Sequence, residues 1–154
     1  MKMRRIYAYL ALAGLLALAA CSGPAQPVSG APLDFTAVCT KANDGKRVAV
    51  LGYLRLPDSY TGDNDILLNL YPTTDYAGTP IAVDMDIGTQ ANQVENVDDQ
   101  YTYADLRVHL ADNSVATDGT QVRVSGQVYF PLMSGNVNFT CGLQSPQVEA
   151  AQAP

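Results

Sequence analysis

The chain of 154 residues carries 15 acidic and 9 basic side chains, which gives a net charge of −6. Because nucleic-acid binding depends on Lys and Arg that neutralise phosphates, this balance argues against a nucleic-acid partner. The length is sufficient for one domain with a hydrophobic core. Only 16% of the residues are charged, so much of the polar surface must be uncharged, as suits an exported β-protein.

The first 20 residues have the composition of a secretory signal peptide. Lys2, Arg4 and Arg5 precede an uncharged stretch over 6–20 that ends in small residues. A basic head, a short apolar stretch and a small-residue cleavage site are typical of such signals. The alternative is a retained transmembrane helix, but spanning a bilayer takes ~20 predominantly apolar residues. We therefore predict that residues 1–20 are removed.

The end of this segment carries a more specific signal. Residues 18–21 read Leu-Ala-Ala-Cys, which resembles the lipobox of bacterial lipoproteins. The resemblance implies that Cys21 starts the mature chain and carries a diacylglyceryl group, usually with an N-acyl chain such as palmitate. Stable anchoring in a bilayer takes more than one such chain. Ser22 stands where aspartate would imply inner-membrane retention, so the resemblance favours the outer membrane, facing the periplasm, over the inner membrane or the cell surface.

The rest of the chain divides into a linker, a domain and a tail. Residues 21–33 are rich in Pro, Gly and Ser, a composition typical of a flexible linker. Residues 34–149 carry the apolar patterns of a single domain. Residues 150–154 are small or polar, and we expect them to be disordered.

Two cysteines remain once Cys21 is assigned to the lipid. Cys39 and Cys141 form an even pair in an oxidising compartment, which indicates a disulfide. This disulfide would close a loop of about 100 residues and so constrain the unfolded chain. Two buried free thiols are the alternative. A metal pair is disfavoured because the single histidine, His109, has no ligand-like spacing to either cysteine.

Apolar residues that alternate with polar ones, between clusters of turn residues, predict a series of strands. The clearest alternation places Val122 and Val124 inward and Arg123 and Ser125 outward. Residues 34–40 could form either a helical turn or a short strand. The predicted strands cover residues 47–56, 66–71, 81–87, 101–110, 121–130 and 138–148.

Two stretches in the middle of the chain are ambiguous. Residues 88–100 are polar, and a loop or one short helix fits them. Residues 101–110 contain Thr102 and Asp105 at the spacing of a helix capping box. The same stretch alternates apolar and polar residues from Ala104 onward, and on that pattern we favour a strand.

Five or six strands with almost no helix indicate an all-β domain, either a small closed barrel or a sandwich. Residues 48–54, which surround Gly52, resemble the curved first strand of an OB-fold, and residues 122–128 resemble its penultimate strand. The resemblance implies a five- to six-stranded OB-like barrel in which residues 88–100 replace the usual inter-strand helix. First and last strands can be neighbours in such a barrel, so the disulfide would tie the termini together. An immunoglobulin-like β-sandwich is the alternative.

The sequence offers little material for catalysis. His109 could act as a general base, but a solvated histidine on a strand is the simpler interpretation. Asp84 and Asp86 lie on one face of a predicted strand, about 7 Å apart by strand rise. That spacing could suit acid–base chemistry. More often, however, acidic residues at i and i+2 on the outer face of a strand are only solvated surface residues. We predict neither an enzyme nor a cofactor.

A cluster of oxygen-bearing side chains makes calcium the one metal candidate. Asp58, Asp63 and Asp65 lie in one loop around Gly62, and calcium prefers clustered oxygen ligands. The spacing differs from that of an EF-hand loop, so the site would be weak. A solvated turn is the alternative.

Outward tyrosines form the candidate binding surface. The outer face of an OB-like barrel would carry Tyr71, Asp84 and Asp86 on its second and third strands, a poor set for phosphates because it contains no basic side chain. A peptide, a sugar or a partner protein fits it better. Tyr53 and Tyr129 also point outward in this interpretation, and tyrosine is enriched at interfaces. Packing of these rings on the barrel surface is the alternative.

These features predict a membrane-anchored lipoprotein of the cell envelope with a non-catalytic binding or adaptor domain. The bilayer would be one partner, through acylated Cys21, and an envelope protein, peptide or glycan the other. The alternatives are a structural envelope lipoprotein without a specific small ligand and a weak calcium-binding module. An enzyme ranks behind both.

Overall fold

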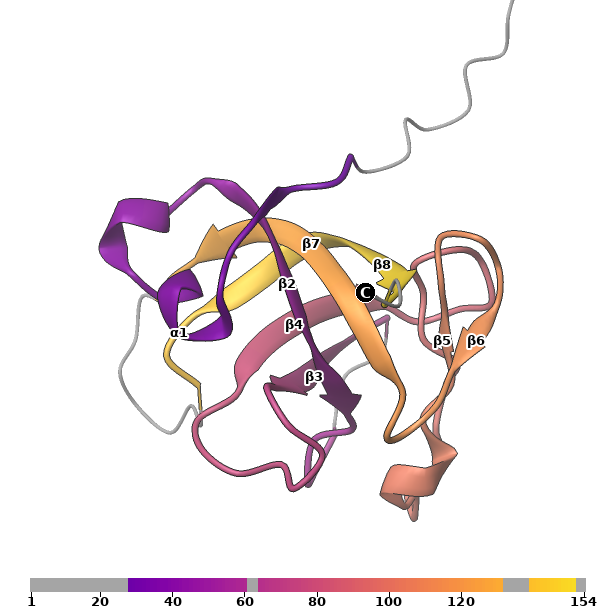
Figure 1. The fold of residues 1–154 in the computed structure, drawn as a ribbon. Coiled ribbons are helices and arrows are strands. Elements are labelled where there is room, and N and C mark those ends of the chain that lie inside the picture. The colour runs from indigo at the N-terminus through magenta and orange to yellow at the C-terminus, as the bar shows by residue number, and fades with distance from the viewer. Residues whose placement is uncertain (1–27, 61–63, 132–138, 152–154) are drawn as a thin grey trace, which may run out of the picture.

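A computed structural model describes residues 28–60, 64–131 and 139–151 (Figure 1). The predicted signal peptide, Cys21 and most of the predicted linker therefore lie outside the described residues. The elements in chain order are β1 (Ala31–Pro32), α1 (Phe35–Val38), η1 (Lys41–Asn43), β2 (Arg47–Arg55), β3 (Asp65–Tyr71), β4 (Ile81–Asp86), η2 (Tyr103–Asp105), β5 (Val108–His109), β6 (Val115–Ala116), β7 (Gln121–Tyr129) and β8 (Gly142–Ala150).

Five strands close into a barrel. The order around it is β2-β3-β4-β8-β7, and the return pairing of β7 with β2 closes the ring. Every contact between neighbours is antiparallel except that of β4 with β8, which is parallel. This is the small OB-like barrel expected from the sequence, and the β-sandwich alternative is wrong.

The alternating sequence explains why these strands form a barrel with one core. In β3, Ile66, Leu68 and Leu70 are buried, whereas Leu67 between them is 39% exposed. Residues i and i+2 share a face of a strand, so each strand lines the interior with one set of apolar side chains. The core is filled mainly by Val, Leu and Ile from all five strands.

Strand β2 pairs on both of its sides, and Gly52 lies where the pairing passes from β7 to β3. Its first part pairs with β7 and its last part, Tyr53–Arg55, pairs with β3. A Cβ atom at Gly52 would lie 2.6 Å from the backbone oxygen of Tyr71 and 2.9 Å from a methyl carbon of Leu70. Only glycine lets the two backbones approach this closely. The role that the OB-fold resemblance implies for this strand, pairing on both of its sides to close the barrel, is confirmed.

The predicted disulfide between Cys39 and Cys141 is present, with 5.4 Å between the Cα atoms. Residue 39 follows α1, so the undecided stretch 34–40 is a helical turn rather than a strand. Cys141 immediately precedes β8 and is fully buried. The bond therefore ties the N-terminal turn to the start of the last strand.

The N-terminal segment is attached to one end of the barrel. β1 pairs in parallel with β2, although Ala31 and Pro32 belong to the stretch predicted as a linker. Arg47, the first residue of β2, donates hydrogen bonds to the carbonyl oxygens of Val28, Ser125 and Ser145. The burial of this side chain lowers the pKa of the Arg47 guanidinium. These bonds fix where the chain joins the barrel.

Residues between β4 and β7 depart from the sequence prediction. The strand predicted over 101–110 is wrong for its first part, where Thr102 and Asp105 form a capping box at the start of η2. A strand is present only at Val108–His109, which pairs with β6. The polar stretch 88–100 is a loop without a helix, and Val94 forms two isolated bridges, a parallel one to Ile87 and an antiparallel one to Val108.

Two smaller expectations about the last strands need correction. Ser125, predicted to face outward, is fully buried, and the pairing of β7 with β8 is irregular between Ser125 and Gln127. The alternation itself is kept, because Val124 and Val128 are buried on either side of the irregularity. Ser125 is therefore covered although it belongs to the other set of alternating positions, and the Arg47 guanidinium donates to its carbonyl. The strand predicted over 138–148 runs later, from Gly142 to Ala150, so the predicted tail begins inside a strand.

Among the described residues, no helix is long and apolar enough to cross a membrane.

Candidate functional site

The tyrosines and aspartates predicted as a binding surface lie on the outer wall of the barrel. Tyr53 and Tyr71 are cross-strand partners on β2 and β3. Asp84 and Asp86 lie on β4, and Tyr129 is the last residue of β7. They therefore spread over four strands rather than converging on one point.

The acidic part of this wall is crowded. Asp86 is the cross-strand partner of Asp65, and Asp84 lies two residues before it on the same face. Partial burial, followed by repulsion from Asp65 and then Asp86, raises the pKa of Asp84. This patch can accept hydrogen bonds, but its charge disfavours an anionic ligand.

Tyr129 has a packing role that the sequence did not reveal. A Cβ atom at Gly142 would lie 2.4 Å from two ring carbons of Tyr129, so the ring covers the bare backbone of the neighbouring strand. Burial, with a smaller contribution from the nearby Asp84 charge, raises the pKa of the Tyr129 hydroxyl. Tyr129 therefore fits the alternative of a ring packed on the barrel surface.

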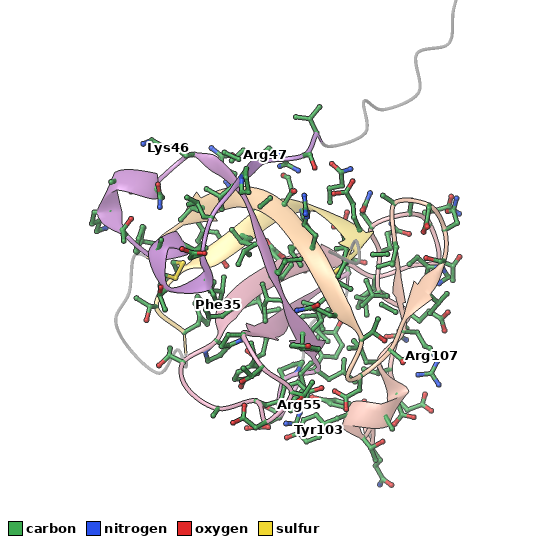
Figure 2. The ribbon with its side chains drawn as sticks, in the orientation of Figure 1. Phe35, Lys46, Arg47, Arg55, Tyr103 and Arg107 are labelled. Carbon is green, nitrogen blue, oxygen red and sulfur yellow. A yellow bond between two sulfur atoms is a disulfide. The ribbon has the colours of Figure 1, made fainter. Side chains whose placement is uncertain are left out.

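A different group of side chains converges at the end of β2, and we refer to Arg55, Tyr71, Tyr76 and Tyr103 as the tyrosine–arginine cluster. The guanidinium carbon of Arg55 lies 3.5 Å from the ring centroid of Tyr103 and 4.2 Å from that of Tyr76. Tyr76 also meets Tyr71 edge-on, with 5.5 Å between centroids. Figure 2 shows Arg55 and Tyr103 together at the end of the barrel opposite Lys46 and Arg47.

Ring stacking, rather than hydrogen bonding, holds Arg55 in place. Its Nε atom is buried and has no hydrogen-bond partner among the described residues. An arginine stacked on aromatic faces keeps its charge while its side chain is fixed. Tyr76 itself adopts a φ of 53°, a conformation that L-residues rarely adopt and that costs about 1–2 kcal/mol. The contacts of its ring compensate for this cost.

The phenol groups of the cluster are oriented by carboxylates. The Tyr103 hydroxyl donates to Asp58 over 2.6 Å, and this hydrogen bond is the main cause of the raised pKa of Tyr103. The Tyr76 hydroxyl donates to Asp118 over 2.7 Å and accepts a hydrogen bond from the Gly119 N–H. Burial and then the bond to Asp118 raise the pKa of Tyr76. Loops from three parts of the chain are joined in this way.

A pocket of about 490 Å³ adjoins the cluster. It is lined by Pro57, Asp58, Tyr101, Thr102 and Tyr103, and we call it the Tyr101 pocket. The Tyr101 hydroxyl donates to the Pro57 carbonyl over 2.6 Å, which holds the ring against the loop after β2. Burial, followed by the charge of Asp58, raises the pKa of Tyr101. The volume is in the range of small-ligand sites.

A second pocket, of about 450 Å³, lies between the N-terminal segment and β2. Leu33, Phe35 and Leu51 give it apolar walls, and Arg123 and Asp34 add one charge of each sign. Nothing in its lining converges on a particular ligand.

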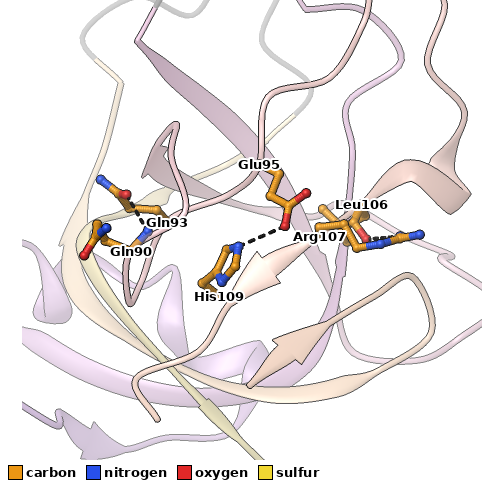
Figure 3. Close-up of polar contacts among 6 residues, drawn as sticks. All are labelled: Gln90, Gln93, Glu95, Leu106, Arg107 and His109. Atoms are coloured by element: carbon orange, nitrogen blue, oxygen red, sulfur yellow. Dashed lines mark hydrogen bonds and ion pairs between the residues drawn. The ribbon is translucent and has the colours of Figure 1, made fainter. Parts of the chain in front are cut away.

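His109 is paired rather than free. Its Nε2 atom lies 3.0 Å from Oε1 of Glu95, the contact drawn as a dashed line in Figure 3, and the imidazole is largely buried. In the same view, Gln90 N–H donates to the Gln93 side chain and Arg107 donates to the Leu106 carbonyl. The contact with Glu95 gives His109 a structural role, so no catalytic role is needed to explain it.

The residues of the calcium candidate are only partly described. Asp63 lies outside the described residues, Asp58 accepts the hydrogen bond from Tyr103, and Asp65 pairs with Asp86. Within residues 28–60, 64–131 and 139–151, no three His, Cys, Asp or Glu side chains are grouped closely enough to hold a metal ion.

The chain matches no known family model, and no curated protein is measurably similar to it in sequence. The proposed function therefore rests on the geometry of the tyrosine–arginine cluster and the Tyr101 pocket.

Proposed function

We propose that this chain is a lipid-anchored protein of the bacterial cell envelope whose barrel is a non-catalytic binding module for a protein, peptide or glycan partner. The observation that carries the proposal is the tyrosine–arginine cluster with its adjoining pocket. Tyrosine and arginine are the side chains most enriched at binding hot spots. Here four of them are gathered at one end of a small barrel.

The cluster suits binding because it is already ordered. Tyr103 and Tyr76 are each held by a stacked arginine and by a hydrogen bond to a carboxylate. A surface with fixed rings loses little side-chain freedom when a partner binds, so more of the contact energy contributes to affinity. This preorganisation supports a binding module over a purely structural lipoprotein.

The place of the cluster also suits a protein that is tethered by its N-terminus. The chain joins the barrel beside Arg47, and the cluster lies beside Arg55, at the other end of the nine-residue strand β2. At the usual rise per residue these two ends are about 25 Å apart. The Leu-Ala-Ala-Cys sequence at residues 18–21 supports an anchor at Cys21. Such an anchor would leave the cluster facing away from the membrane. Ser22 favours the outer membrane, facing the periplasm.

Co-purification from membranes tests the proposal. Full-length tagged protein would be solubilised gently and compared with the variants Cys21→Ala and Tyr76→Ala. We expect wild type to retain a partner, Tyr76→Ala to lose it, and Cys21→Ala to lose membrane attachment. Val115→Ser serves as the control, because Val115 is 45% exposed on the separate β5–β6 hairpin. A solitary wild-type protein that binds no peptide or glycan in direct screening would contradict the proposal.

A further inference from the structure

The Tyr101 pocket has walls suited to a flat ligand. Two tyrosine rings and a proline ring, from Tyr101, Tyr103 and Pro57, supply its apolar surface. Aromatic faces carry partial negative charge and attract the positively polarised edge or C–H groups of a ligand. Both rings are partly exposed, so a ligand can reach them from solvent.

The hydrogen-bond donors of the pocket side chains are already engaged. The Tyr101 hydroxyl donates to the Pro57 carbonyl, and the Tyr103 hydroxyl donates to Asp58. Thr102 directs both its N–H and its hydroxyl to Asp105. Asp58 still has free acceptor positions, because a carboxylate offers about four lone-pair sites. The pocket therefore presents acceptors, and a matching ligand must bring the donors.

The local charge favours a neutral ligand. Asp58 is hydrogen-bonded to Tyr103, and the Arg55 guanidinium lies 3.5 Å from the centroid of the same ring. The positive charge beside Tyr103 disfavours a second cation on that ring, and the carboxylate disfavours an anion. A proline-rich peptide is a poor match as well, because its backbone has few N–H donors to offer Asp58.

We propose that the Tyr101 pocket binds a sugar ring of a neutral glycan. The C–H face of the ring would stack on Tyr101 or Tyr103, and its hydroxyls would donate to Asp58. A neutral sugar ring offers a face of C–H groups for the tyrosine rings, carries no charge and is rich in hydroxyl donors, which are the three properties that the pocket selects. This inference rests on the proposed binding function and narrows its partner to a glycan.

Arg55 is a positioning residue in this site. It does not line the pocket, but its contact with Tyr103 fixes the ring that forms one wall. Arg55→Met keeps much of the side-chain volume and removes the charge. We expect it to weaken sugar binding several-fold while the pH at which Tyr103 ionises shifts upward, because Arg55 lowers the pKa of that phenol. If the ionisation of Tyr103 shifted in Arg55→Met while sugar affinity stayed unchanged, Arg55 would stabilise the cluster without positioning the wall of the pocket.

The direct test titrates detergent-solubilised full-length protein with a panel of neutral oligosaccharides of hexose and N-acetylhexosamine units, including chitotriose. Calorimetry or saturation-transfer NMR measures binding, with trigalacturonate and choline as charged comparison ligands. We expect a neutral sugar to bind more tightly than either. Asp58→Asn should weaken it about 10-fold, equivalent to about 1.4 kcal/mol, and Tyr101→Ala should abolish it.

Two matched controls keep the test specific to the pocket. Tyr101→Phe retains the ring and loses only a hydroxyl that donates to Pro57, so it should still bind sugar. Tyr129→Phe alters a ring on another wall of the barrel and should change nothing. Binding of choline or trigalacturonate in preference to every neutral sugar would overturn the inference, as would equal affinity for Asp58→Asn and wild type.

The outcomes also separate this inference from the proposed function. If the protein retained a membrane partner but bound no neutral sugar below about 10 mM, the sugar-binding inference would be refuted. The proposed function would then be that of an adaptor for a protein or peptide. A protein that retains no partner and binds none of the ligands would refute both.

Discussion

Two arginines on β2 have different roles, which depend on the groups that surround each of them. Arg47 satisfies three backbone carbonyls at the start of β2, whereas Arg55, at its end, is held between two rings. Arginine can do both because its guanidinium is planar, with donors at the edge and a face that stacks. The first fixes the N-terminal segment on the barrel, and the second orders the candidate binding surface.

Replacing Arg55 should loosen the tyrosine–arginine cluster. Arg55→Ala removes two cation–π contacts, and such contacts contribute about 0.5–1 kcal/mol each. We expect the free energy of unfolding in urea to fall by about 1–2 kcal/mol, measured by far-UV circular dichroism. Lys46→Ala removes an exposed cation and should change stability by less than about 0.5 kcal/mol. Equal effects of the two variants would contradict a stabilising stack.

Asp84 should make the protein more stable in mild acid. Its folded-state pKa is raised by burial and by Asp65 and Asp86, so the folded state binds this proton more tightly than the unfolded state does. The resulting stabilisation is complete below the unfolded pKa of about 3.9 and is lost as pH rises through the folded pKa. Asp84→Asn should thus raise stability at pH 7 by about 0.5 kcal/mol, the scale of an exposed charge pair.

Thermal unfolding from pH 3 to pH 8 checks this sign, because the difference between Asp84→Asn and wild type should vanish toward pH 3. Asp112→Asn is the opposite case. Hydrogen bonds from Ser114 lower the pKa of Asp112, so that carboxylate contributes stability above the unfolded pKa and loses it as pH falls. Asp112→Asn should be destabilising at pH 7. If both variants changed the melting temperature at pH 7 in the same direction, the opposite pKa directions assigned to Asp84 and Asp112 would be wrong.

At the level of elements, alternation in the sequence predicts burial better than it predicts strand pairing. Leu106, Val108 and Leu110 are buried and their neighbours are not, so the alternation in 101–110 is real. Only Val108–His109 pairs as a strand, because the local capping box of Thr102 and Asp105 determines the preceding turn. Alternating burial and membership of a sheet are separate properties, and the sequence pattern indicates only the burial.

The close approach of β2 to β3 at Gly52 gives a direct prediction at this scale. Gly52→Ala would place a methyl group 2.6 Å from the Tyr71 carbonyl oxygen, within the backbone of the paired strand. Overpacking of this kind costs about 1–3 kcal/mol, and here backbone cannot move aside. We expect a loss of about 3 kcal/mol in urea unfolding.

Gly78→Ala is the matched comparison for that prediction. Gly78 has a φ of 89° but nothing within 4 Å of the added carbon, so only the backbone cost of about 1–2 kcal/mol applies. A larger loss for Gly78→Ala than for Gly52→Ala would show that the two strands do not approach as described.

For the whole molecule, the disulfide links the two ends of the barrel sequence. Cys39 and Cys141 are 102 residues apart, and a cross-link of this span restricts the unfolded chain strongly. We expect Cys39→Ala/Cys141→Ala to lower the free energy of unfolding by about 3–4 kcal/mol. Reductant should destabilise wild type by a similar amount and leave the double variant unchanged. An effect of reductant on the double variant would refute this explanation.

The sequence was sufficient for the barrel and insufficient for the site. Period-two patterns and Gly52 identified the strands of the barrel because burial imposes those patterns locally. The tyrosine–arginine cluster joins positions 55, 71, 76 and 103, which only the closed barrel brings together. Tyr76 lies in a turn-rich loop and Tyr103 in a wrongly predicted strand, so neither had a local signal. Tyr71 was a candidate from the sequence, but nothing in its surroundings along the chain indicated its partner Tyr76.

The attachment of the N-terminal segment has a mechanical consequence. β1 runs in the same direction as β2, and Arg47 bonds the Val28 carbonyl. Tension between an anchor before Val28 and a partner held near Tyr103 would act along the axis of β2. Inter-strand hydrogen bonds loaded along the strands share the force, whereas bonds loaded across the strands break one after another. A pull on the segment before Val28 would therefore load the β1–β2 pairing in shear instead of peeling it open.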